Sequence, residues 1–159
     1  MRTSYERLSD PDEVLSRVAG VAPKTVIFDV EPLVASWDTD QASLDAGVAL
    51  VLDRLRDVAG IHVVVFATNS VRRPSAVPDD EVGTQVLYFA SAGKPIRTNR
   101  YRRLPPAGLV VGDQVATDGL LARRLGYAFL HYEATGDMPR GPSAMRMLGR
   151  ALRPLLFAR

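Results

Sequence analysis

Short apolar runs separated by amphipathic stretches recur along most of this chain. The apolar runs are rich in Val, Ile, Leu, Phe and Tyr and have the length of buried strands. They lie at about 25–30, 62–67, 86–90, 109–112 and 127–131. Apolar residues at helical spacing predict helices at about 11–19, 43–58, 118–125 and from 143 onward. Since strand, helix and strand in succession favour a right-handed parallel crossover, the pattern predicts one α/β domain. Its sheet is expected to be mostly parallel, with about five strands and helices on both faces.

Composition limits the class of protein and the kind of metal site. At 159 residues, 47% of them hydrophobic, the chain suits a single domain over 1–159 that ends in a basic amphipathic helix at about 143–156. No apolar run approaches the roughly 20 residues that span a bilayer, and the N-terminus lacks the apolar core of a secretory signal, which predicts a cytoplasmic protein. There is no cysteine, and only His62 and His131 could supply imidazole. A metal should therefore be bound by oxygen, which favours Mg²⁺. The net charge of +2 does not favour a nucleic-acid partner.

Polar residues stand where three of the apolar runs end. Asp29 and Glu31 end the first run, Thr68 follows the second, and Asp113 follows the run at 109–112. The carboxyl ends of parallel strands are where open α/β sheets bind ligands. Carboxylates and a hydroxyl at that edge predict a metal-assisted phosphate site.

The order of these motifs resembles a known family. Lys94-Pro95 lies between the second and third of the polar strand ends, and Gly112-Asp113-Gln114 is followed by Thr117-Asp118. From Leu8 to Tyr132, the chain resembles the haloacid dehalogenase superfamily of aspartyl-phosphate phosphatases. It looks most like the small capless subgroup that includes phosphatidylglycerophosphate phosphatases. The resemblance implies a Rossmann-like domain without a cap domain and a Mg²⁺-dependent phosphomonoester hydrolase.

The resemblance also implies roles for the first motif. Asp29 would be the nucleophile that takes up the phosphoryl group. Glu31 stands where the superfamily usually has the aspartate that acts as general acid and base. Its extra methylene moves the carboxyl group, and Pro32-Leu33 departs from the usual motif. Glu31 as a working acid and base, and Glu31 in a degenerate or ligand-orienting site, are therefore equal alternatives.

The remaining site residues are expected to bind phosphate and metal. Thr68, with Asn69 in support, would donate hydrogen bonds to phosphate oxygens, and Lys94 would neutralise phosphate and aspartate together. Only two of the 20 basic residues are lysines, so a lysine here favours a selected point charge. The metal ligands would be Asp113, Asp29 and the backbone carbonyl of Glu31. Asp118 would orient a metal-bound water or Lys94, or would cap the following helix.

Two basic regions add candidate binding surfaces. Arginine forks after Lys94 would suit an anionic head group, an acidic protein or RNA phosphates, or would form a solvated loop. These are Arg97, Arg100, Arg102 and Arg103. The helix from 143 has an apolar side that either covers the sheet or lies on an anionic membrane surface. That side consists of Ala144, Leu148, Ala151, Leu152 and Leu155, with Arg146, Arg150 and Arg153 elsewhere.

The expected function is hydrolysis of a phosphorylated substrate, with a lipid head group at the inner membrane face as the candidate that the resemblance names. The alternative is a catalytically degenerate relative that binds a phosphate-bearing ligand or a protein partner. The sequence leaves the oligomeric state open.

Overall fold

A six-stranded, all-parallel sheet forms the centre of the protein in a computed structural model that describes residues 4–77, 83–134 and 140–157. The strands are β1 (Tyr5–Leu8), β2 (Thr25–Asp29), β3 (Val63–Ala67), β4 (Gln85–Phe89), β5 (Gly108–Gly112) and β6 (Ala128–Tyr132), in the order β1-β6-β5-β2-β3-β4. The α/β fold with a parallel sheet is confirmed. The additional strand is β1, which pairs with β6 alone and forms one edge of the sheet.

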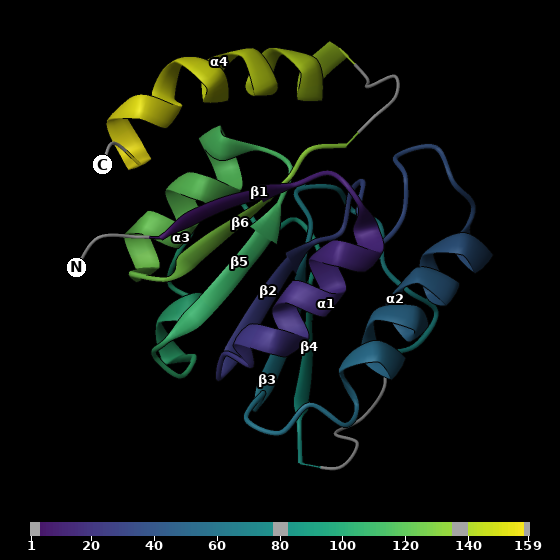
Figure 1. Cartoon of the computed structure of the whole chain (residues 1–159). Coiled ribbons are helices and arrows are strands. Elements are labelled where there is room, and N and C mark those ends of the chain that lie inside the picture. The colour runs from purple at the N-terminus through teal and green to yellow at the C-terminus, as the bar shows by residue number, and fades with distance from the viewer. Residues whose placement is uncertain (1–3, 78–82, 135–139, 158–159) are drawn as a thin grey trace.

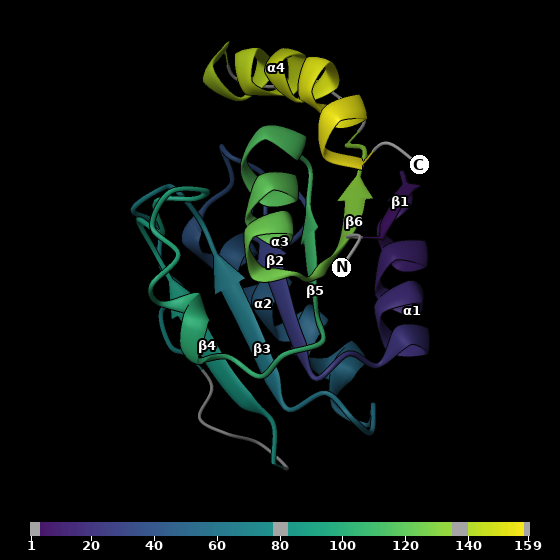
Figure 2. The same cartoon turned by 90° about the vertical axis from the view of Figure 1, so that its left-hand side faces the viewer.

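Helices cover both faces of the sheet (Figure 1, Figure 2). Helices α1 (Pro11–Val21) and α2 (Gln41–Leu55) lie on one face, and α3 (Leu120–Leu125) lies on the other. A fourth helix, α4 (Arg140–Phe157), lies outside these layers. The predicted helix at 118–125 starts earlier, as a π-helical turn, η2 (Val115–Gly119), that leads directly into α3.

Alternation along the strands divides the core between the two faces. Val26 and Phe28 of β2 pack on the side of α1 and α2, whereas Ile27 between them packs on the side of α3. Val64 and Val65 of β3 divide in the same way. Since both faces are covered, these strands are apolar throughout, which is why they appear in the sequence as continuous apolar runs.

The carboxyl ends of β2 and β5 lie side by side at the point where the chain stops adding strands on one side of β2 and begins to add them on the other. From β2, the chain proceeds to β3 and β4 on one side and then crosses to β5 and β6 on the other. Phe28 pairs with Val111, and Asp29 pairs with Ala67. Ligands of open α/β sheets bind at such a switch point.

Helix α2 touches the segment that follows β2 at Gly47. A Cβ atom on Gly47 would lie 1.9 Å from the backbone carbonyl oxygen of Val34. We therefore expect Gly47→Ala to lower the free energy of unfolding by about 1–3 kcal/mol, although alanine is the better helix former. Urea denaturation measures this effect. Gly20→Ala in α1 is the control, because a Cβ atom there meets nothing within 4 Å. Equal stability of Gly47→Ala and the wild type would contradict the close approach.

Helix α4 lies across the carboxyl ends of the strands and does not cover a face of the sheet (Figure 1, Figure 2). It packs on η2, where Gly149 is buried against Val115. At its C-terminal end, Phe157 stacks on Phe129 of β6 at a centroid distance of 5.6 Å. Of the two predicted roles of its apolar side, covering the sheet does not hold, since Leu148 and Leu155 are 47% and 75% exposed. None of the helices within the described ranges is long and apolar enough to cross a membrane.

Candidate active site

A buried lysine joins two carboxylates at the switch point. Lys94 Nζ lies 2.8 Å from Asp29 Oδ1 and 2.8 Å from Asp118 Oδ1. It also donates to the carbonyl oxygen of Ala67 at 3.1 Å, so all three ammonium protons have acceptors. Burial alone would lower the pKa of Lys94, but the attraction of Asp118 and Asp29 outweighs burial and raises it. Lys94 is therefore a permanent positive charge in this site.

The neighbouring carboxylates carry more negative charge than Lys94 balances. Oxygens of Asp29, Asp113 and Asp118 all lie within 4.8 Å of one another, and all three residues are buried. Burial and then the charge of Asp118 raise the pKa of Asp29 well above its usual value, while Lys94 opposes this shift. The same causes raise the pKa of Asp113 to about 7. Asp29 and Asp113 therefore resist being ionised beside Asp118 unless another cation is present.

Asp113 is the member of this group that fits a metal ion best. Both of its carboxylate oxygens are buried without a hydrogen-bond partner among the described residues. Leaving buried polar atoms unpaired is costly, and a bound cation would satisfy them. A set made only of carboxylate oxygens suits a hard divalent cation such as Mg²⁺. The acidic group could therefore hold a metal ion. The carbonyl of Glu31 as a ligand stays a prediction.

Asp118 positions Lys94 and is not the N-cap of α3, whose N-cap residue is Gly119. Its Oδ2 accepts hydrogen bonds at 3.3 Å from the backbone N–H of Gln114 and from the hydroxyl of Thr117. Helix α3 begins only at Leu120. The Asp118 side chain packs directly against the backbone of Gly112. A Cβ atom at Gly112 would lie 2.5 Å from Asp118 Cγ, so a side chain there would displace the carboxylate.

Glu31 is turned toward the end of β3. Its carboxylate accepts hydrogen bonds from the hydroxyls of Thr68 at 2.6 Å and Ser70 at 3.2 Å, and lies 3.6 Å from the guanidinium of Arg72. In this arrangement the Thr68 hydroxyl, which the resemblance assigns to phosphate, donates to Glu31. Ser70 and Arg72 were not among the site residues predicted from the sequence. The polar residues at alternate positions 68, 70 and 72 after β3 were the available signal.

Asn69 positions the segment that carries Lys94. Its side-chain oxygen accepts from the backbone N–H of Lys94 at 2.8 Å, and its side-chain nitrogen donates to the carbonyl oxygen of Lys94 at 3.2 Å. Both ends of the amide are therefore used within the protein. Asn69 thus links the end of β3 to the loop after β4.

An open pocket of about 580 Å³ brings the predicted catalytic residues together. Asp29, Glu31, Thr68, Asn69 and Lys94 all line it. Its other walls include four apolar residues that were not among the site residues predicted from the sequence. These are Trp37, Ile96, Met145 and Leu148, the last two from α4.

The arginines after Lys94 do not line this pocket. The guanidinium of Arg100 lies 5.7 Å from the ring centre of Phe89, in a cation–π arrangement. The side-chain carbons of Arg97 lie against Gly93. Arg102 and Arg103 belong to a short 3₁₀ helix, η1 (Tyr101–Arg103). Substrate binding by these four residues stays a prediction.

Comparisons of the chain with protein-family models, with curated proteins and with solved structures gave no match. The chemical interpretation of the pocket therefore depends on its own geometry and on the resemblance of its motifs.

Proposed function

We propose that the protein hydrolyses phosphomonoesters with the help of Mg²⁺, through a covalent phosphoryl intermediate on Asp29. One observation carries the proposal. Asp29 lines an open pocket and is paired with Lys94, and its carboxylate lies within 4.8 Å of those of Asp113 and Asp118, which are buried beneath the pocket lining. Asp29 and Asp113, with Asp118 close by, would hold the cation. Bound there, it would neutralise the carboxylates and polarise the phosphate oxygens.

The reaction divides into two displacements at phosphorus. A carboxylate oxygen of Asp29 attacks, the P–O bond to the alcohol breaks, and the leaving oxygen takes a proton from Glu31. The Glu31 carboxylate then removes a proton from a water molecule, whose oxygen attacks phosphorus. Inorganic phosphate leaves and the Asp29 carboxylate is restored. Lys94 offsets the negative charge of Asp29 and phosphate throughout.

Hydrolysis of a small phosphomonoester such as para-nitrophenyl phosphate tests this function. We expect activity that requires Mg²⁺ and stops on chelation with EDTA. Asp29→Asn should lower kcat by about 10⁴-fold or more, because it removes the nucleophile. Asp38→Asn is the control, since Asp38 is exposed and lies outside the pocket lining. Activity that persists in Asp29→Asn or in EDTA would overturn the proposal.

A second candidate is a catalytically degenerate protein that binds a phosphate-bearing ligand or a protein partner. The engagement of Glu31 with Thr68, Ser70 and Arg72 favours it, because these contacts occupy both the acid and base candidate and a phosphate-binding hydroxyl. Glu31→Asp distinguishes the two functions. The shorter side chain should release Thr68, so a site that needs only this change would gain activity. A degenerate site would gain none while still binding phosphate.

We further propose that the substrate is amphiphilic, with a lipid head group at the inner membrane face as the leading candidate. The resemblance names phosphatidylglycerophosphate, and the apolar walls of the pocket support such a substrate. Ile96 is 76% exposed and Met145 is 40% exposed. A lipid phosphomonoester in mixed micelles should therefore have a lower KM than the small ester. Equal KM values would count against this substrate class.

A further inference from the structure

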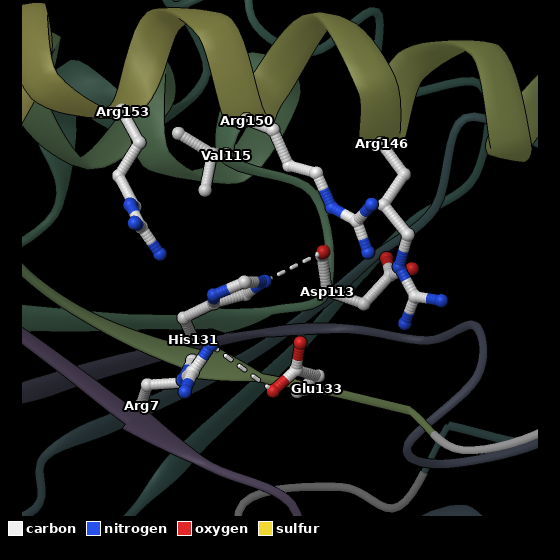
Figure 3. Close-up of a pocket in the computed structure, with 8 residues that line it drawn as sticks. All are labelled: Arg7, Asp113, Val115, His131, Glu133, Arg146, Arg150 and Arg153. Carbon is white, nitrogen blue, oxygen red and sulfur yellow. Dashed lines mark hydrogen bonds and ion pairs between the residues drawn. The ribbon is translucent and has the colours of Figure 1, made fainter.

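A second pocket lies between α4 and the strands β1 and β6, and its lining is dominated by arginine (Figure 3). Arg7 comes from β1, and Arg146, Arg150 and Arg153 come from α4. Spacings of four and three residues place the three helical arginines on one side of α4. Figure 3 shows Arg153 extending from the helix toward His131 on β6, and Arg150 extending toward Asp113. No residue of the described ranges lines both this pocket and the open pocket of the candidate active site. Of the three grouped carboxylates, only Asp113 lines the second pocket.

The positive charge of this pocket exceeds what the protein balances. Arg7 lies 3.3 Å from the carboxylate of Glu133, and Arg146 donates to the carbonyl oxygen of Ala134 at 2.7 Å. Within the described part of the chain, neither Arg150 nor Arg153 has a hydrogen-bond or ion-pair partner. The lining contains four guanidinium groups and two carboxylates. Like charges that converge in this way repel each other, and a bound anion would offset the repulsion.

His131 forms a fixed wall of the pocket and adds no charge. Its Nε2 lies 2.9 Å from the carbonyl oxygen of Asp113, which can only accept, so Nε2 carries the proton. Nδ1 then accepts from the hydroxyl of Tyr5 at 2.8 Å. With both ring nitrogens occupied within the protein, the arginines are the groups left to bind a ligand.

The size and chemistry of the pocket define the class of ligand. Its volume is about 50 Å³. This volume restricts the ligand to a small ion or to one functional group of a larger molecule. Guanidinium forks match the oxygens of a tetrahedral oxyanion such as phosphate in geometry. We propose that this pocket binds a phosphate group, held by Arg150 and Arg153 together with Arg7. The site does not depend on the proposed hydrolysis, because none of these arginines belongs to the candidate active site.

Calorimetric titration of the full chain with inorganic phosphate in EDTA tests the site. The wild type should bind phosphate saturably without a metal. Arg150→Gln with Arg153→Gln should weaken binding by about tenfold or more, because two charge-assisted hydrogen bonds are lost. Glutamine keeps the helix propensity of arginine, and circular dichroism checks the fold. Arg17→Gln with Arg54→Gln is the matched control. It removes the same charge from exposed ion pairs on α1 and α2 and should leave binding unchanged.

A further variant distinguishes this site from the active site, and a vesicle experiment distinguishes free phosphate from a lipid head group. Asp29→Asn should bind phosphate as the wild type does. If Asp29→Asn weakens phosphate binding and the double variant Arg150→Gln with Arg153→Gln does not, phosphate binds at the active site and the proposal is overturned. The absence of phosphate binding to the wild type would also overturn it.

Sedimentation with phosphatidylcholine vesicles, with and without phosphatidic acid, tests for a lipid ligand. Vesicle binding that depends on the arginine pair and on phosphatidic acid would identify a lipid phosphate. Binding of inorganic phosphate alone would identify the free ion.

Discussion

Lys94→Met should lower the free energy of unfolding by about 3–5 kcal/mol at neutral pH, because it leaves two buried carboxylates without their counter-charge. Asp29 and Asp118 each lie 2.8 Å from the ammonium that the substitution removes. Urea denaturation of the metal-free protein measures the loss. Without Lys94, the attraction that opposes the raised pKa of Asp29 is lost, so that pKa should rise further and the folded variant should bind a proton that its unfolded chain releases. Its stability should therefore recover as the pH falls from neutral toward 5.

Lys24→Met is the matched control, since Lys24 is exposed and is the only other lysine of the chain. A surface substitution of this kind should change the free energy of unfolding by less than about 0.5 kcal/mol. Equal effects of the two lysine substitutions would contradict the buried ion-pair arrangement around Lys94.

Asp113→Asn should have opposite effects on stability without and with Mg²⁺. Burial, together with the charge of Asp118, raises the pKa of Asp113 from 3.8 to about 7 in the metal-free protein. The folded chain therefore holds a proton that the unfolded chain has lost, and stability falls as the pH rises from about 4 to about 7. At pH values above 7, the neutral amide should raise the free energy of unfolding by about 2–4 kcal/mol. The same variant should lose the stabilisation that Mg²⁺ gives the wild type.

Thermal unfolding with and without Mg²⁺ checks both effects of Asp113→Asn. Asp57→Asn, at an exposed position, controls for the loss of one carboxylate and should behave as the wild type does. If Asp113→Asn retains the full Mg²⁺ stabilisation, Asp113 is not a ligand. If the metal-free variant is no more stable than the wild type above pH 7, ionised Asp113 does not destabilise the folded protein as the account requires.

The sequence predicted the elements whose burial is uniform. Strands β2, β3 and β5 are covered on both faces, so their apolar runs stand out, and the polar residues that end them mark one edge of the sheet. The convergence of Asp29, Thr68 and Asp113 follows from that geometry alone. Strand β1 was missed because it is short and pairs on one side only. Two of its four residues, Glu6 and Arg7, are charged.

The features that could not be predicted from the sequence are those that long-range packing decides. Apolar residues and arginines share the surface of α4, so its own pattern does not tell which side meets the protein. Contact through Gly149 directs Arg150 and Arg153 toward the second pocket, an outcome that needs the position of η2. The two roles of Asp118 were equally open because an acid just before a helix suits a cap. The π-helical turn decides between them by directing its carboxylate to Lys94.

The nucleophilic role of Asp29 is the central claim, and trapping the intermediate tests it most directly. The protein is mixed with a labelled phosphomonoester and Mg²⁺, quenched in acid, which preserves acyl phosphates better than base does, and digested for mass spectrometry. We predict a phosphoryl group on Asp29 in the wild type and none in Asp29→Asn. Turnover without an adduct, or an adduct on another residue such as Asp113, would contradict the claim.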